Sequence, residues 1–117
     1  MTFSASAGFT PAHRLLREDG FDHVVHAGSI ADRHFKIFFV RNIKSNARLG
    51  IIVGKRTLPS AAQRNRVKRA IREVFRRHSI KVQQLDLVVL VRSADSQASP
   101  AVDLEALFNQ VEKRCAS

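Results

Sequence analysis

The sequence has little of what marks secreted or membrane proteins. Its 117 residues include one cysteine, Cys115, so the chain cannot form an internal disulfide framework, and a reducing compartment is expected. No apolar run approaches the roughly 20 residues that a membrane-spanning helix needs. The first residues also lack the basic start and apolar core of a secretory signal. We therefore expect a cytoplasmic protein that forms one domain over residues 1–117, with residues 1–12 mobile.

Acidic residues are scarce, and the imbalance of charge is concentrated in one segment. Residues 55–81 contain ten Lys or Arg and a single acid, a net charge of +9, out of +10 for the whole chain. Residues 1–54 carry +3 and residues 82–117 carry −2. The hydrophobic share of 44% argues against global disorder. A folded chain with its charge gathered in this way is typical of proteins that bind nucleic acid or another polyanion.

Signatures of protein-borne catalysis and metal binding are weak. Residues 50–57 resemble a phosphate-binding loop, but the glycine spacing and the hydroxyl position are each off by one. His23 and His26 lie three residues apart without a His-Glu-x-x-His motif or a cysteine cluster, so solvent-facing or RNA-facing histidines are favoured over a zinc site. The sequence shows no pattern typical of a Ser-His-Asp catalytic triad. We assign no catalytic residue and no metal ligand to the protein.

The hydrophobic periodicity predicts alternating helices and strands in the order α-β-β-β-α-β-α, an α+β two-layer α-β sandwich with one sheet. The strands at residues 34–40 and 49–53 are expected to pair as an antiparallel hairpin across a polar turn. Before them we expect a helix from residues 18–19 to Gly28 and a brief strand 29–31. After them we expect a helix that begins after the cap Ser60, a polar exit 78–84 and a strand 85–91 covered on both faces. The last expected element is a helix with core positions 102, 104, 107, 108 and 111, capped by Ser99 or Asp103.

The basic helix has two faces. A stripe at helical spacing is expected to pack on the core and consists of Val67, Ala70, Ile71, Val74 and Phe75. A rotation of about 100° per residue places Asn65, Arg69, Arg72 and Arg76 together on the other side. Like charges four residues apart destabilise an isolated helix, so an anionic partner is the natural compensation. Arginine outnumbers lysine here, which favours bidentate phosphate contacts and stacking on bases.

The strands present one apolar face and one mixed face. Phe35, Ile37 and Phe39 are expected in the core, whereas the alternate face carries Lys36, Phe38 and Val40. In the next strand Leu49, Ile51 and Val53 are core candidates. Gly50 and Gly54 on its other face allow close approach of a backbone or ligand, or else mark a bulge or close helix packing.

Residues 64–76 resemble the signature of the bacterial ribonuclease P protein component. That family carries an Arg-Asn-Arg core, then an aliphatic residue, Lys-Arg, and a later Arg-Glu and Phe-Arg, as Arg64-Asn65-Arg66-Val67-Lys68-Arg69-Ala70-Ile71-Arg72-Glu73-Val74-Phe75-Arg76 does here. The similarity extends over about residues 14–114 and includes residues 14–15 with Phe21, 35–38, 48–51, 53–56 and 86–89. The chain departs from the family pattern in residues 58–63, where a Gly-Asn-Ala-Val-like approach is common, and at Val25, where some members have an aromatic residue.

The resemblance implies a protein subunit that assists a catalytic RNA in removing the 5′ leader of precursor tRNA. The RNA subunit would hold the Mg²⁺ ions, and the protein would be a monomer in the holoenzyme. The implied fold is ribosomal protein S5 domain 2-like, with a left-handed βαβ crossover, although strand–helix–strand connections are generally right-handed. The implied contacts to the RNA subunit are Lys55, Arg56, Arg64, Asn65, Arg66, Lys68, Arg69, Arg72 and Arg76. The implied contacts to the leader are Arg14, Phe21, Lys36 and Phe38.

Two other functions are compatible with the same residues. One is an RNA-binding or ribosome-binding module without a role in cleavage. The other is a protein nuclease, which the absence of a carboxylate or histidine cluster in the sequence speaks against.

Overall fold

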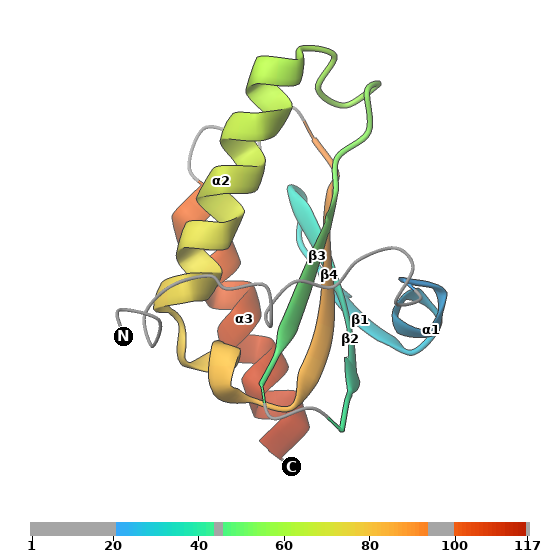
Figure 1. Ribbon diagram of the computed structural model, residues 1–117, viewed down its shortest axis with the longest axis vertical. Helices are drawn as coiled ribbons and strands as arrows, with labels where there is room; N and C mark the ends of the chain where they lie inside the picture. Colours follow the sequence, from blue (N-terminus) through green and yellow to red (C-terminus); the bar gives the residue numbers. More distant parts are fainter. Residues whose placement is uncertain (1–20, 44–45, 94–99, 117) are drawn as a thin grey trace, which may run out of the picture.

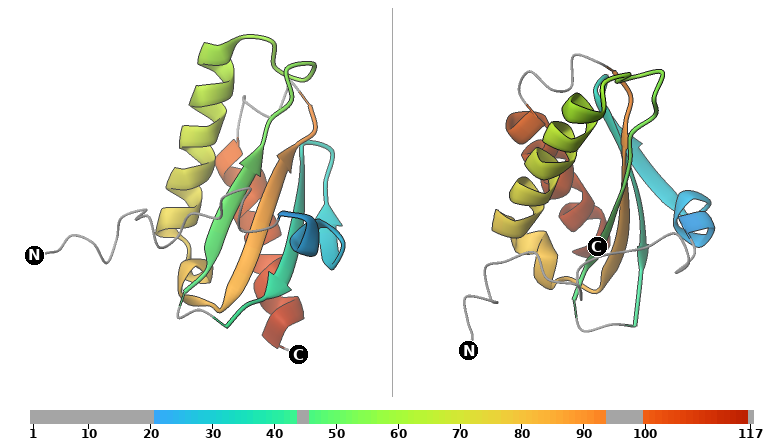
Figure 2. Two further views of the ribbon diagram at one scale, coloured as in Figure 1. Left: turned by 45° about the vertical axis from the view of Figure 1, so that its right-hand side comes forward. Right: turned by 45° about the horizontal axis from the view of Figure 1, so that its top comes forward.

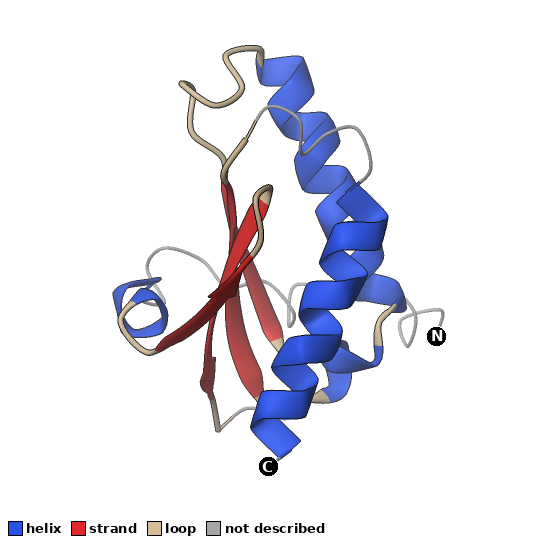
Figure 3. Ribbon diagram, turned by 180° about the vertical axis from the view of Figure 1, so that it is seen from behind, coloured by secondary structure: helices blue, strands red, loops and turns tan. Residues whose placement is uncertain are grey.

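A four-stranded sheet with helices on both faces organises the structure (Figure 1). The computed structural model describes residues 21–43, 46–93 and 100–116. In chain order the elements are α1 (Phe21–Val25), β1 (Gly28–Ala31), β2 (Phe35–Arg41), β3 (Arg48–Ile52), α2 (Ala61–Arg77), the 3-10 turn η4 (Ser79–Val82), β4 (Leu85–Val91) and α3 (Pro100–Ala116). α2 and α3 cover one face, and the short α1 lies on the other (Figure 3). The predicted α+β sandwich and its order of helices and strands are confirmed, with η4 as an addition.

The central strand is β4, and the predicted hairpin between residues 34–40 and 49–53 is wrong. The strands are ordered β1-β2-β4-β3, so β4 separates β2 from β3. β4 pairs antiparallel with β2 and parallel with β3. Six of its seven residues are buried. A central position, with a strand on each side and helices over both faces, removes more of this apolar surface from water than an edge position would. That burial outweighs the tendency of strands joined by a short loop, as β2 and β3 are, to pair with each other.

α2 connects the parallel strands β3 and β4 by a left-handed crossover. In the left view of Figure 2, β4 lies to the right of β3 while α2 and α3 lie behind the sheet. A right-handed connection would place β4 on the other side of β3 when seen from this face. The general preference for right-handed crossovers therefore fails here, and the family resemblance gave the correct hand.

The main core fills the space between the sheet and the helices α2 and α3. From α2 it takes Val67, Ile71 and Phe75, each at most 1% exposed. The rings of Phe75 and Phe108 meet edge to face with centroids 6.3 Å apart, which ties α2 to α3. The other core side chains come from all the strands, the residues just before β3 and α2, η4 and α3: Ile30, Phe35, Ile37, Ala47, Leu49, Leu58, Ile80, Leu85, Leu87, Val89, Val91, Leu104, Leu107 and Val111. The predicted core faces of residues 35–39 and 49–53 are confirmed, with Phe39, Ile51 and Val53 partly buried against this cluster.

Four details near the helix ends differ from expectation or lie beyond the described residues. Val102 is 73% exposed, because it lies on the opposite side of α3 from the buried Val111. Asp103 lies inside the first turn of α3 and is not its cap, while Ser99 is outside the described residues. The polar exit contains a buried Ile80 within η4. The lead-in 1–12 and the expected helix start at residues 18–19 also fall outside the described residues.

None of the helices in the described part of the chain is long and apolar enough to cross a membrane.

Candidate nucleic-acid interface

The exposed face of α2 is polar and cationic. Ser60 caps the helix as predicted, and its Oγ accepts a hydrogen bond of 3.3 Å from the backbone N–H of Gln63. Opposite the buried stripe, Asn65, Arg66 and Arg69 are exposed. Lys68 and Arg72 are half-buried at the edge of this face. We call Asn65, Arg66, Lys68, Arg69 and Arg72 the basic face of α2.

Two of the predicted RNA contacts on α2 interact within the protein. Arg64 Nη1 donates to the backbone carbonyls of Leu58 and Pro59, both at 2.8 Å, so this guanidinium fastens the turn before the helix. Arg76 forms an ion pair with Glu73, including a 3.0 Å bond from Nε to Oε1. Arg77 Nε lies 2.8 Å from the same carboxylate. One carboxylate therefore offsets one of the two positive charges at the end of α2.

The rotation of α2 also differs slightly from the helical-wheel prediction. Arg72 and Arg76 are half-buried, whereas Arg66, which is not among the four residues predicted to share the side opposite the stripe, is exposed. The fully buried positions follow an i, i+4, i+8 row, Val67, Ile71 and Phe75, and the outward direction opposite that row passes between Arg66 and Arg69. The sequence thus predicted a cationic face but placed its centre too far toward Arg72.

Glu73 is the one acid on α2, and its titration reflects its neighbours. A hydrogen bond from Arg76, together with the charges of Arg76 and Arg77, holds the pKa of Glu73 below its ordinary value. The carboxylate is therefore ionised at neutral pH and keeps both arginines near the end of the helix.

A tight turn carries two more cations next to the start of α2. Leu58 is 1% exposed, and its backbone N–H donates to the carbonyl of Gly54 at 3.1 Å. This anchor leaves Lys55 and Arg56 exposed beside the N-terminal end of the basic face. Gly54 is exposed, and a Cβ there would meet the Thr57 Oγ1 at 3.9 Å, an ordinary contact. No described atom therefore lies so close to Gly54 that a residue without a side chain is needed there.

A second candidate surface lies on the sheet face that α1 covers. Val24 of α1 and Val88 of β4 are fully buried against each other there, and Phe38, Val40 and Ile52 pack around them. Lys36 lies on the same face of β2, with its Nζ 5.0 Å from the centroid of the Phe38 ring. Both of these side chains are half-buried. The mixed face noticed in the sequence is therefore apolar under α1, with a cation and the partly exposed Phe38 ring beside it.

The structure brings together two of the four residues predicted to contact the leader. Lys36 and Phe38 are neighbours on β2. Phe21 is the first residue of α1, but its side chain and the whole of Arg14 lie outside what the structure describes.

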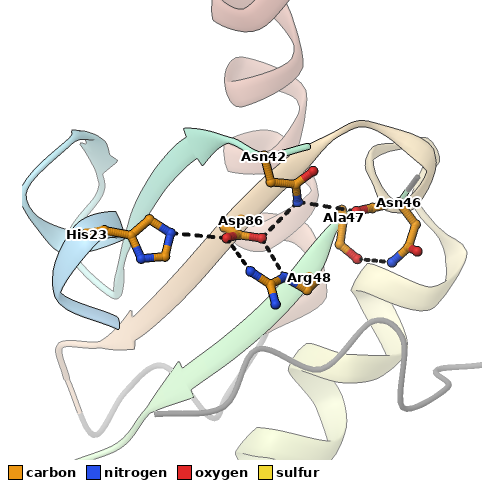
Figure 4. A network of polar contacts seen from close by, with 6 residues as sticks. All are labelled: His23, Asn42, Asn46, Ala47, Arg48 and Asp86. Atoms are coloured by element: carbon orange, nitrogen blue, oxygen red, sulfur yellow. Dashed lines mark hydrogen bonds and ion pairs between the residues drawn. The ribbon is translucent and has the colours of Figure 1, made fainter. Parts of the chain in front are cut away.

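Asp86 is a functional candidate that the sequence reasoning did not single out. It is 1% exposed and is the one buried charged side chain among the described residues. Figure 4 shows that donors from three other segments converge on its carboxylate. Arg48 Nε and Nη2 donate to Oδ1 and Oδ2 at 2.9 and 2.8 Å, and Asn42 Nδ2 donates to Oδ1 at 2.8 Å. His23 Nε2 lies 3.1 Å from Oδ2, which connects α1 to the same group.

The partners of Asp86 keep it ionised. Burial by itself raises the pKa of Asp86, but the hydrogen bonds from Arg48 and Asn42, the charge of Arg48 and the contact with His23 together lower it below its ordinary value. One signal in the sequence pointed here: a single acid inside the apolar strand Leu85–Val91 must find buried partners. Arg48, directly opposite Asp86 in the β3–β4 register, is that partner.

The two histidines considered for a zinc site have different surroundings, and only His23 is near Asp86 among the contacts described. His23 contacts Asp86, and the described residues contain no group of three His, Cys, Asp or Glu side chains that could hold a metal ion.

Comparisons with known proteins agree with the resemblance seen in the sequence. The family model described as Ribonuclease P matches residues 9–115. The chain is 34% identical over 113 residues to the ribonuclease P protein component of Chromobacterium violaceum, covering 93% of each chain. It is 41% identical over 106 residues to that of Halorhodospira halophila, covering 89% of this chain and 87% of the relative.

A solved structure supports the same assignment. The RNase P protein of Staphylococcus aureus matches with a TM-score of 0.70 and 28% sequence identity, covering 88% of this chain and 94% of that one. The sheet order, the hand of the crossover and the arginine-rich helix thus occur in a chain whose sequence matches this family over nearly its full length. The chain belongs to the ribonuclease P protein component family.

Proposed function

We propose that this chain is the protein subunit of a bacterial ribonuclease P ribonucleoprotein, and that it assists the RNA subunit in removing the 5′ leader of precursor tRNA by endonucleolytic cleavage. The observation that carries the proposal is the basic face of α2, held outward by a buried stripe in a chain of this family. The protein acts in the cytoplasm as one copy per holoenzyme.

In this proposal the basic face of α2 and the turn before it bind the RNA subunit. Arg66 and Arg69 are exposed, and their planar guanidinium groups suit bidentate contacts to phosphate oxygens. Asn65 between them can contact a base edge or a 2′-hydroxyl. Lys55 and Arg56 extend the same positive surface. Arg64 and Arg76 are assigned a supporting role, since each is fastened to the protein's own carbonyls or carboxylate.

The face of the sheet beside α1 binds the single-stranded leader. Grooves for single strands combine a stacking surface with positive charge along the backbone. The half-buried Phe38 ring and the Lys36 ammonium beside it supply both within one strand. Phe21 and Arg14 remain candidates for the same surface from the family resemblance.

The chemistry is assigned to the RNA. Mg²⁺ ions held mainly by the RNA subunit would activate the water that hydrolyses the phosphodiester bond. The protein's contribution is electrostatic and positional, because its cations reduce the repulsion between two RNAs and hold the leader in place.

A pair of matched variants tests the RNA-binding face. Arg69→Ala removes an exposed cation from the basic face, whereas Arg77→Ala removes the same charge from the part of α2 that Glu73 compensates. We expect the logarithm of affinity for the RNA subunit to depend on the logarithm of salt concentration less steeply in Arg69→Ala, by about 0.7 to 0.9. Arg77→Ala should keep the wild-type slope. Equal slopes in both variants, or a flat salt response in the wild type, would contradict the assignment.

A second experiment tests the leader surface. Phe38→Leu keeps an apolar side chain for α1 to pack on but removes the stacking ring, and the loss of one base–aromatic stack should weaken binding of a precursor tRNA with a leader of several nucleotides by about tenfold. Lys113→Ala, on the exposed side of α3, serves as control because α3 covers the other face of the sheet. If Phe38→Leu binds the precursor as the wild type does, Phe38 is not a leader contact.

A further inference from the structure

We infer that the contact between His23 and Asp86 sets the position of α1 over the sheet and thereby shapes the surface that receives the leader. His23 and Asp86 are then positioning residues for substrate binding. The inference rests on the proposed leader surface. It adds that the polar contact between His23 and Asp86, which we call the latch, holds α1 at the edge of that surface.

α1 depends on tertiary contacts for its position. It has five residues, far fewer than a helix needs to be stable alone. Val24 provides one anchor, because it is fully buried against Val88 and is surrounded by partly buried side chains of β2 and β3. A single apolar anchor restrains the distance of α1 from the sheet but leaves the helix able to tilt about that point.

His23 supplies a second anchor of a different kind. It precedes Val24 and brings its Nε2 to 3.1 Å from the Asp86 Oδ2. Because the ionised carboxylate only accepts hydrogen bonds, the His23 Nε2 must carry the hydrogen in this contact. The two anchors, one apolar and one polar, fix both the height and the tilt of α1.

Asp86 is itself held rigidly, so the latch has a fixed end. Arg48 binds both carboxylate oxygens from β3, and Asn42 binds one from the end of β2 (Figure 4). Asn42 Nδ2 also donates to the carbonyl of Asn46 at 3.3 Å, which includes the β2–β3 loop in the network. Three neighbouring segments therefore determine where α1 is attached.

The latch and the leader surface are adjacent on the same face of the sheet. In the β2–β4 register, Phe38 lies opposite Val88 and Val40 lies opposite Asp86. Asp86 and Val88 point to the same face and are about 7 Å apart along β4. The Phe38 ring therefore packs in the cluster beneath Val24, one step along the strand from the latch. A tilt of α1 would change how much of that ring is covered and how close α1 comes to Lys36.

The experiment uses the holoenzyme reconstituted with its RNA subunit and two precursor tRNAs, one with a leader of several nucleotides and one with a single-nucleotide leader. His23→Ala removes the latch, and His23→Gln retains a side-chain N–H that can donate to Asp86. His26→Ala is the control, since His26 is exposed and follows α1 by one residue.

We expect His23→Ala to weaken binding of the long-leader substrate by about tenfold, as the loss of a hydrogen bond to a charged group implies. Binding of the single-nucleotide substrate should stay within about twofold of the wild type, because that substrate barely reaches the leader surface. His23→Gln should recover much of the loss, and His26→Ala should match the wild type. Amide hydrogen exchange on the free protein should be faster in α1 of His23→Ala and unchanged in α2 and α3.

The possible failures are distinguishable. If the wild-type holoenzyme binds both substrates equally, the proposed leader surface fails. If the wild type favours the long leader and His23→Ala does too, the latch is overturned while the leader surface stands. An equal loss for both substrates, or faster exchange throughout the protein, would also overturn it, since His23 would then support the whole fold.

Discussion

Removal of the Asp86 carboxylate should strongly lower the free energy of unfolding, because three other residues donate to or contact this one group. In Asp86→Leu the Arg48 guanidinium, 17% exposed in the ion pair, would lose both carboxylate oxygens of Asp86. Asn42 and His23 would each lose an acceptor as well. The cost is therefore that of a largely buried cation and a half-buried amide deprived of the carboxylate to which they donate, in addition to the lost hydrogen bonds.

The contacts set the scale of this effect. Breaking a buried ion pair by removing one partner typically costs about 3–5 kcal/mol. The contact with His23 contributes less to this cost than the bonds from Arg48 and Asn42, because the His23 side chain is 47% exposed and water can replace part of the contact. A loss of this size is a large part of a total stability of about 5–15 kcal/mol. For a domain of this length it corresponds to a fall in Tm of roughly 10–20 °C.

A double-mutant cycle separates the pair from general damage to the core. The variants are Asp86→Leu, Arg48→Met and the double replacement, each measured by urea denaturation. We expect the double variant to be more stable than the sum of the single effects predicts, with a coupling energy of about 2–3 kcal/mol, because the lone buried cation is no longer present. If the two changes add within about 0.5 kcal/mol, Asp86 and Arg48 do not stabilise each other and the reasoning is refuted.

Three further predictions concern the fold. Ser60→Ala should lower the free energy of unfolding by about 1 kcal/mol through loss of the α2 cap, and an unchanged urea midpoint would remove Ser60 as a cap. Phe75→Ala should cost about 3–5 kcal/mol, because it empties the contact between α2 and Phe108; a loss below about 1 kcal/mol in urea denaturation would contradict that packing. The folded-state pKa of Asp86 is lowered, so its stabilising contribution is present above its unfolded pKa of about 3.9 and is lost as the pH falls through the folded value. Urea denaturation below about pH 4 should therefore show wild-type stability falling more steeply than that of Asp86→Leu, and parallel pH curves would speak against this.

Local patterns predicted most of the elements. The alternation in residues 35–39 and the stripe of α2 each follow directly from residue spacing, and both are confirmed. The pairing of the strands did not follow, because loop length favours sequential neighbours whereas the burial of β4 on both faces decides the centre of the sheet. The hand of the crossover was available only from the family resemblance.

The candidate site was predicted unevenly for a similar reason. The positive charge of α2 is visible in composition alone, and its exposed residues Arg66 and Arg69 were among those predicted. That Arg64 binds carbonyls of its own chain requires the path of the turn before α2, which no periodicity specifies. The network around Asp86 joins residues up to 63 positions apart, so it becomes apparent only when the sheet order is known.

In the proposed function this protein assists an RNA that performs the cleavage. The most direct measurement compares cleavage of precursor tRNA at low Mg²⁺ by the cognate RNA subunit alone, by the protein alone, and by both together. We expect little cleavage by either component alone and efficient release of the 5′ leader by the mixture. No stimulation of the RNA subunit would favour an RNA-binding module without a role in cleavage, and cleavage by the protein alone would indicate a protein nuclease; either result would contradict the account.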